Sequence, residues 1–161
     1  MPWIIIISII LSISLIQTTL LPQISILSTQ PDLFIIFLVY FSLNSDFEHA
    51  FHVNWSTGLA KDFFSEDPFG LNAVMFIMAG YIISIIKSKV FRKHLMTQIL
   101  VTLTISIIYN LLYLFMLSIS LSSVNLLSLI WKCPIIAVYN SIIVPPIFWL
   151  LDRLYPFSVS K

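Results

Sequence analysis

The stretch GLAKDFFSEDPFGLN, residues 58–72, gathers chemically versatile side chains within a chain that is otherwise mainly apolar. It contains two of the three glycines and three of the seven acidic residues, which are Asp62, Glu66 and Asp67. Catalysis typically needs a nucleophile, a base and a group that orients the base, and no such set is visible in the sequence. We therefore expect these acids to have a structural function.

Two histidines are the second candidate for chemistry. His49 and His52 lie three residues apart, close enough to share a metal ion, and Glu48 is adjacent. They also lie beside a predicted turn at the end of a membrane helix, where ordinary polar residues are expected. We interpret them as interfacial residues and predict no metal, no cofactor and no enzymatic activity.

Lys132 is a cation within an apolar run. One interpretation is that its side chain extends to the nearby membrane surface, since it lies only a turn or two from the end of its helix. The alternative is an internal ion pair, perhaps with Asp62, because charges inside a membrane often have a partner.

The composition shows where these residues must lie. The chain has 161 residues, of which 59% are hydrophobic and only 9% charged, and its mean hydropathy is +1.02. Soluble domains carry about 25% charged residues, so this is an integral membrane protein of the all-α class. The net charge of +1 provides no basic surface for nucleic acid, and the single cysteine excludes an internal disulfide bond.

Apolar runs predict about six transmembrane helices in one bundle, as a single transmembrane domain over residues 1–161. The expected helices are 3–21, 33–43, 49–64, 70–86, 95–121 and 126–151. The second run is short, which suggests a helix partly sheltered by protein. Pro134, Pro145 and Pro146 should kink or end the last helix.

Basic residues predict the orientation. Half of them lie between the fourth and fifth helices, at Lys87, Lys89, Arg92 and Lys93. The positive-inside rule places this loop in the cytoplasm. Arg153 and Lys161 place the C-terminus there too, and six spans then place the N-terminus on the same side. If helix 49–64 re-enters the membrane without crossing it, the N-terminus lies on the other side.

Polar residues follow defined faces of three predicted helices. The third helix has two such faces, so we expect other helices to surround it. One face contains Asn54, Gly58, Lys61 and Ser65, and the other contains His49, His52 and Ser56. The fifth helix has one polar face, formed by Gln98, Thr102, Ser106, Tyr109 and Tyr113. The sixth helix has one formed by Ser128, Lys132 and Tyr139. We infer a hydrogen-bonded interior built mainly by these three helices, in which Tyr109 and Tyr113 pack with tethered hydroxyl groups.

The opening stretch is typical of a tight helical hairpin. Gly58 permits close contact between helix backbones, and Gly80 repeats this small-residue contact in the next helix. Pro68 ends the first helix of the hairpin, and Gly70 and Asn72 begin the second. Two kinds of partner are open for the Asp62 carboxylate: the Lys132 cation, or the free backbone N–H groups at residues 70–72. Asp32 similarly stands where the N-cap of the second helix is expected.

These motifs together resemble the rod-shape-determining protein MreD family. The resemblance rests on a Pro-Asp-Leu that opens the second helix, a Gly-Leu-x-x-Asp hairpin and a following Pro-x-Gly-Leu-Asn. The matching residues are Pro31, Asp32, Leu33, Gly58, Leu59, Asp62, Pro68, Gly70, Leu71 and Asn72. The family usually has a Gly-aromatic pair before the Gly-Leu, whereas this chain has Asn54 and Trp55.

The resemblance implies a function in cell elongation at the bacterial inner membrane. It implies a fold similar to the substrate-binding subunits of energy-coupling-factor transporters, and a direct partner, MreC. MreB, RodA and a class B penicillin-binding protein would belong to the larger assembly, surrounded by membrane lipid. We therefore expect a non-catalytic scaffold that helps regulate peptidoglycan synthesis. A vitamin-type transporter subunit is the alternative, although only Ser8 and Ser12 offer a small-residue face on the first helix.

Overall fold

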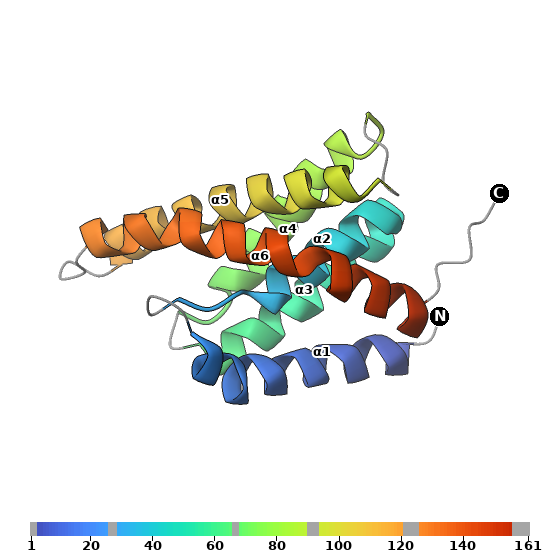
Figure 1. The fold of residues 1–161 in the computed structure, drawn as a ribbon, viewed down its shortest axis with the longest axis horizontal. Coiled ribbons are helices and arrows are strands. Elements are labelled where there is room, and N and C mark those ends of the chain that lie inside the picture. Colours follow the sequence, from blue (N-terminus) through green and yellow to red (C-terminus); the bar gives the residue numbers. More distant parts are fainter. Residues whose placement is uncertain (1–2, 26–28, 66–67, 90–93, 121–125, 156–161) are drawn as a thin grey trace.

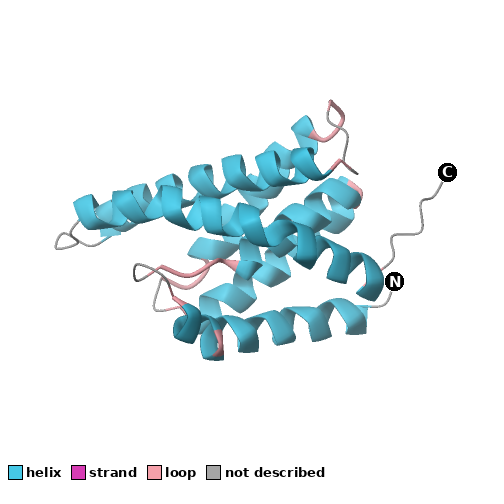
Figure 2. Cartoon of the chain, in the orientation of Figure 1, coloured by secondary structure: helices cyan, strands magenta, loops and turns pink. Residues whose placement is uncertain are grey.

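The computed structural model describes residues 3–25, 29–65, 68–89, 94–120 and 126–155. These residues form six α-helices joined by loops, so the all-helical prediction is confirmed (Figures 1 and 2). The helices are α1 (Trp3–Thr19), α2 (Leu33–Asn44), α3 (Phe47–Phe64), α4 (Leu71–Ile86), α5 (Leu95–Ser120) and α6 (Leu126–Leu154), and a short 3-10 helix, η1 (Leu21–Ile24), follows α1. Glu66, Asp67, Arg92, Lys93 and Lys161, and the side chain of Ser128, lie outside the described residues.

Successive helices run in opposite directions between two ends of the bundle (Figure 1). At one end, the Lys87 ammonium that follows α4 donates to the Ser45 carbonyl that follows α2, at 2.7 Å. The Trp3 ring at the start of α1 contacts the His49 ring in the first turns of α3, with centroids 5.7 Å apart. The Tyr40 hydroxyl donates to Asp152 near the end of α6, at 2.7 Å. This first end therefore contains the start of α1 and the end of α6.

The length of the helices supports three membrane spans directly. Among the described residues, helical segments within Trp3–Gln23, Leu95–Met116 and Ile130–Leu154 are long and apolar enough to cross a membrane. The apolar helix α2 has 12 residues, or about 18 Å, against about 30 Å of hydrocarbon. Six full spans therefore remain a prediction. The alternating direction of successive helices is the arrangement that six spans would require.

The short helix α2 is the centre of the core. Every residue from Leu33 to Leu43 is buried, and the helix packs against each of the other five. It has this position because all its side chains except Ser42 and the terminal Asn44 are apolar or aromatic, so no face requires water. The predicted shelter of this helix by protein is confirmed.

The prediction that other helices surround α3 is wrong. Among the described residues, the backbone of α3 lies against α4, α2 and α1, and the helix leaves His52 and Trp55 exposed. The exposed face is tolerable because it is largely aromatic, and because His52 lies near the first end of the bundle. Polar residues on two faces of α3 therefore do not require other helices to cover all its sides.

The prolines were predicted to kink or end α6; they do not end it, because the helix continues past all three to Leu154. A proline removes one backbone donor, and the remaining hydrogen bonds and the neighbouring helices can hold the chain helical on either side. In Figure 1 the C-terminal part of α6 slopes away from the line of its first part.

Two glycines allow close contact at the α3–α4 interface. A Cβ atom on Gly58 would lie 2.9 Å from both the Ala73 nitrogen and the Asn72 carbonyl oxygen, which are backbone atoms of α4. A Cβ atom on Gly80 would lie 3.3 Å from the Ser42 hydroxyl and would also meet the side chain of Asn54. Gly58 thus admits a helix backbone, whereas Gly80 admits the buried amide of Asn54, which donates to Ser42 at 2.8 Å.

Replacing Gly58 by leucine should separate α3 from α4 and destabilise the protein. We expect a loss of about 1–3 kcal/mol, as for overpacking in general, because the obstructing atoms are backbone and cannot rotate away. Thermal unfolding in detergent measures it. Trp55→Leu is the control, since it places leucine on the exposed face of the same helix. Equal stability of the two variants would contradict this interface.

Candidate functional site: a buried polar network

The Asp62 carboxylate binds the start of a helix other than its own. One oxygen, Oδ1, accepts from the Asn72 backbone N–H and side-chain amide, both at 2.9 Å. The other, Oδ2, accepts from the backbone N–H groups of Gly70 at 3.0 Å and Ala73 at 3.2 Å. Asp62, at the end of α3, thus satisfies donors that α4 leaves free in its first turn, where the helix dipole also favours an anion.

The local sequence explains why α4 takes its cap from another helix. Its N-cap residue is Gly70, which has no side chain to supply a hydrogen bond. Gly70 has a φ angle of 93°, a left-handed conformation that residues with a side chain rarely adopt. The glycine thus makes the tight turn, and Asp62 supplies the missing acceptor.

Of the two partners open for Asp62, the structure contains the backbone N–H groups. The alternative of an ion pair with Lys132 is wrong: within the described ranges the only ion pair joins Lys61 to Asp32, and Lys132 is half-buried on α6. Four N–H donors already stabilise the Asp62 charge, which removes the need for a cation.

Asp32 has the matching function at the start of α2. Its Oδ1 accepts from the Phe34 and Ile35 N–H groups at 3.1 and 3.3 Å, so the predicted N-cap is confirmed. Its Oδ2 accepts from the Lys61 ammonium on α3. The two side chains are only 15% and 17% exposed, so each needs the other as a partner.

Tyr109 and Asn72 join the two carboxylates into one network. The Lys61 ammonium lies 4.5 Å from the centre of the Tyr109 ring, within range of a cation–π interaction. The Tyr109 hydroxyl donates to the Asn72 side-chain oxygen, and the nitrogen of that amide donates to Asp62. The expected tethered hydroxyl of Tyr109 is confirmed, and the half-buried Tyr113 ring stacks on it at 6.3 Å.

Asn140 and Gln17 connect the remaining helices. The Asp32 N–H donates to the Asn140 oxygen at 2.7 Å, and the Asn140 amide nitrogen donates to Ser106 at 2.9 Å. Gln17 accepts from the Leu33 N–H at 3.0 Å and donates to the Pro31 carbonyl at 3.1 Å. Each of the six helices therefore contributes at least one group to the network.

A scan against protein families places this network in context. The model of the rod shape-determining protein MreD matches residues 1–154. The chain belongs to the MreD family. It is therefore a rod-shape-determining membrane protein, and the transporter alternative is not favoured. Comparison with curated proteins and with solved structures gave no match, so the likeness to energy-coupling-factor subunits stays a prediction.

Several motif residues of the MreD resemblance take part in the network. Asp32 and Asp62 are both anchors of the network, and Gly70 and Asn72 bind the second of them. Pro68 lies exposed in the hairpin turn, where its carbonyl accepts from the Leu71 N–H at 3.1 Å. Gly80 and Lys132 lie outside the network.

Sequence reasoning missed Asn140 and Gln17. Asn140 is fully buried in α6, whereas the predicted face of that helix contained Tyr139, which is only half-buried. An asparagine alone in the middle of an apolar span was the available signal, since such a residue needs a partner inside the protein. The pairing of Lys61 with Asp32 was also missed, although Lys61 lies on the predicted polar face.

The network is suited to holding helices together. Its carboxylates already accept hydrogen bonds from groups on several helices. Among the described residues, no three His, Cys, Asp or Glu side chains are placed to hold a metal ion. His49 and His52 instead pack against the ring of Trp3.

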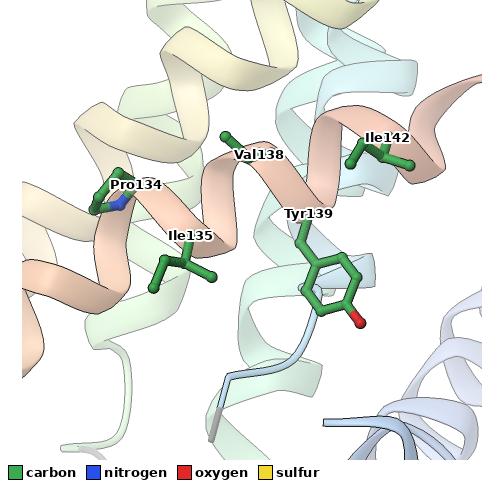
Figure 3. A pocket seen from close by; sticks show the side chains of 5 residues that line it. All are labelled: Pro134, Ile135, Val138, Tyr139 and Ile142. Carbon is green, nitrogen blue, oxygen red and sulfur yellow. The ribbon is translucent and has the colours of Figure 1, made fainter. Parts of the chain in front are cut away.

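The described surface includes two hollows that bear on function. One, of about 370 Å³, lies along α6 beside Pro134, Ile135, Val138, Tyr139 and Ile142 (Figure 3), and its lining is almost wholly apolar. The other, of about 460 Å³, reaches Asp32 and Lys61 and so opens onto the network.

Substitution of Asp62 should reveal the strength of the hairpin cap. Asp62→Leu removes all its acceptors, and we expect a loss of about 3–5 kcal/mol, because the buried N–H groups of α4 become unpaired. Asp62→Asn keeps one oxygen and should lose about half as much. Denaturant unfolding in detergent measures both.

Asp46 provides the control for these variants. It stands at the N-cap of α3, is exposed, and makes no side-chain cap hydrogen bond. Asp46→Leu and Asp46→Asn should therefore change the stability little. If Asp62→Leu were as stable as Asp46→Leu, Asp62 would not hold the hairpin.

Proposed function

We propose that this MreD-family protein is a non-catalytic scaffold of the cell-elongation machinery, which holds MreC in the bacterial inner membrane. In this proposal residues 1–161 form one transmembrane domain with both termini in the cytoplasm. The α3–α4 turn then faces outward, on the side where the large part of MreC lies. Through MreC, the scaffold would act with MreB, RodA and a class B penicillin-binding protein to regulate peptidoglycan synthesis.

An exposed aromatic pair beside the α3–α4 turn carries the proposal. The Phe63 and Phe69 rings are 73% and 66% exposed. They contact each other edge to face, with centroids 5.2 Å apart. Aromatic side chains are enriched at the centres of protein interfaces, because they bury a large area with few rotatable bonds.

The polar network supports this surface from beneath. Phe63 follows Asp62 directly, and Phe69 precedes Gly70, whose N–H group Asp62 binds at 3.0 Å. The cap therefore fixes both aromatic residues relative to each other before a partner arrives. A rigid surface loses less conformational freedom on binding, which favours affinity.

Substitution of the aromatic pair should separate partner binding from folding. We expect Phe63→Ser with Phe69→Ser to reduce MreC recovered by co-purification in mild detergent about tenfold or more. The thermal stability should stay near that of the wild type, because both side chains are exposed.

Phe47→Ser is the matched control. Phe47 is also exposed, at 46%, but it lies at the start of α3, at the opposite end of that helix. This variant should retain MreC. If the double variant is stable and still retains MreC, the partner binds elsewhere and this assignment of the docking surface is wrong.

A further inference from the structure

Two exposed tryptophans mark the ends of the membrane span in α6. Trp131 is 73% exposed and Trp149 is 58% exposed. They are 18 positions apart, or about 27 Å along a helix, against about 30 Å of hydrocarbon. They also lie near the two ends of the apolar segment Ile130–Leu154, where tryptophan rings reach the lipid headgroups. Trp149 therefore lies at headgroup level, at the first end of the bundle.

The Arg153 side chain lies over the Trp149 ring. Its guanidinium carbon is 4.4 Å from the centre of the ring, within range of a cation–π interaction. The two residues are four positions apart in the last turns of α6, so they share a face of the helix. The N–H groups of a guanidinium lie in its plane, so a group that stacks on a ring keeps these donors available at its edge.

Arg153 has no paired carboxylate in the described part of the chain. Its side chain is exposed, and the one ion pair found there joins Lys61 to Asp32. The adjacent acid, Asp152, instead accepts from the Tyr40 hydroxyl at 2.7 Å. Neighbouring residues on a helix point in different directions, so Asp152 is a poor partner for Arg153. The cation at the end of this span therefore lacks a counter-ion from the protein.

Apolar side chains flank the pair of Trp149 and Arg153. Leu150 and Leu154 are 45% and 49% exposed, and each follows one member of the pair directly. The arginine fork matches two oxygens of a phosphate group, and the leucines can contact acyl chains. A phospholipid combines these two features. The unpaired positive charge favours a lipid with a net negative charge, because the cation of a zwitterionic headgroup offsets its phosphate.

We propose that Trp149 and Arg153 form a binding site for the headgroup of an anionic phospholipid, as phosphatidylglycerol is. The phosphate oxygens accept from the Arg153 guanidinium, which the Trp149 ring holds in place, and Leu150 and Leu154 contact the adjoining acyl chains. This inference does not depend on the proposed function in holding MreC.

Quenching of Trp149 fluorescence tests the proposal, because a brominated acyl chain quenches a tryptophan that it contacts. The reporter is the full chain in which the other three tryptophans are replaced by phenylalanine. These rings, at 39%, 44% and 73% exposed, contribute little to the core, so the reporter should fold, and thermal unfolding checks that it does; they are Trp3, Trp55 and Trp131.

The reporter is reconstituted in bilayers of phosphatidylcholine that contain either brominated phosphatidylglycerol or brominated phosphatidylcholine. The dependence of quenching on the fraction of brominated lipid gives the relative affinity of each lipid for the surface beside Trp149. We expect phosphatidylglycerol to bind there about fivefold more strongly than phosphatidylcholine, since one basic residue near a membrane surface favours an anionic lipid by about this factor.

Arg153→Gln should reduce the preference for phosphatidylglycerol to about one. This variant keeps a polar side chain and removes no ion pair, so its thermal stability should match that of the reporter. Lys89→Gln is the matched control, because Lys89 is an exposed cation that follows α4 at the same end of the bundle. The control should keep the preference.

Three outcomes would overturn the proposal. Equal affinity of the two lipids for the reporter would mean that the Arg153 charge is not recognised. A preference that survives in Arg153→Gln would assign the anionic lipid to other residues. An equal loss of preference in Lys89→Gln would mean that the general charge of this end attracts the lipid, without a site at Trp149 and Arg153.

Discussion

A charge buried among membrane helices must find its partner within the protein, because hydrocarbon offers none. The ion pair between Asp32 and Lys61 meets this requirement, and the rest of the network depends on it. Asp32 fixes the first turn of α2, the helix on which all others pack. Lys61 brings α3 to that turn and places its charge over the Tyr109 ring of α5. Breaking the pair would leave one largely buried charge without its partner.

The charges of the two carboxylates, Asp32 and Asp62, are balanced by different groups. Asp32 caps its own helix and uses a cation to balance its charge, whereas Asp62 caps a neighbouring helix and is balanced by N–H groups alone. Both lie away from the end that contains the start of α1: Asp62 adjoins Phe63, and Asp32 lines the larger of the two hollows described above. The rigidity that a scaffold needs is therefore concentrated where we propose that the partner binds. The first end of the bundle is held differently, through aromatic contacts and the hydrogen bond of Lys87 to Ser45.

Local features of the chain were predictable from its sequence, and the long-range pairings were not. The helices, the N-cap at Asp32 and the close contact at Gly58 follow from apolar runs and from the chemistry of one or two turns. The Asp62 cap was one of two open choices, because the distance from Asp62 to Lys132 depends on how α3 and α6 pack. Lys61 and Asp32 are 29 residues apart, and Asn140 lies 108 residues from Asp32. Nothing in the spacing along the chain relates such residues, so only the folded bundle shows that they meet.

A double-mutant cycle on Asp32 and Lys61 tests most directly whether their ion pair holds the bundle together. Asp32→Asn removes the charge but keeps a good N-cap, and Lys61→Met removes the cation but keeps a side chain of similar length. Denaturant unfolding in detergent gives the free energy for each variant. We predict that each single variant loses about 3–5 kcal/mol, and that the double variant loses at least about 2 kcal/mol less than their sum. If the two losses are additive, the ion pair does not couple α2 to α3, and the network is not what stabilises the fold.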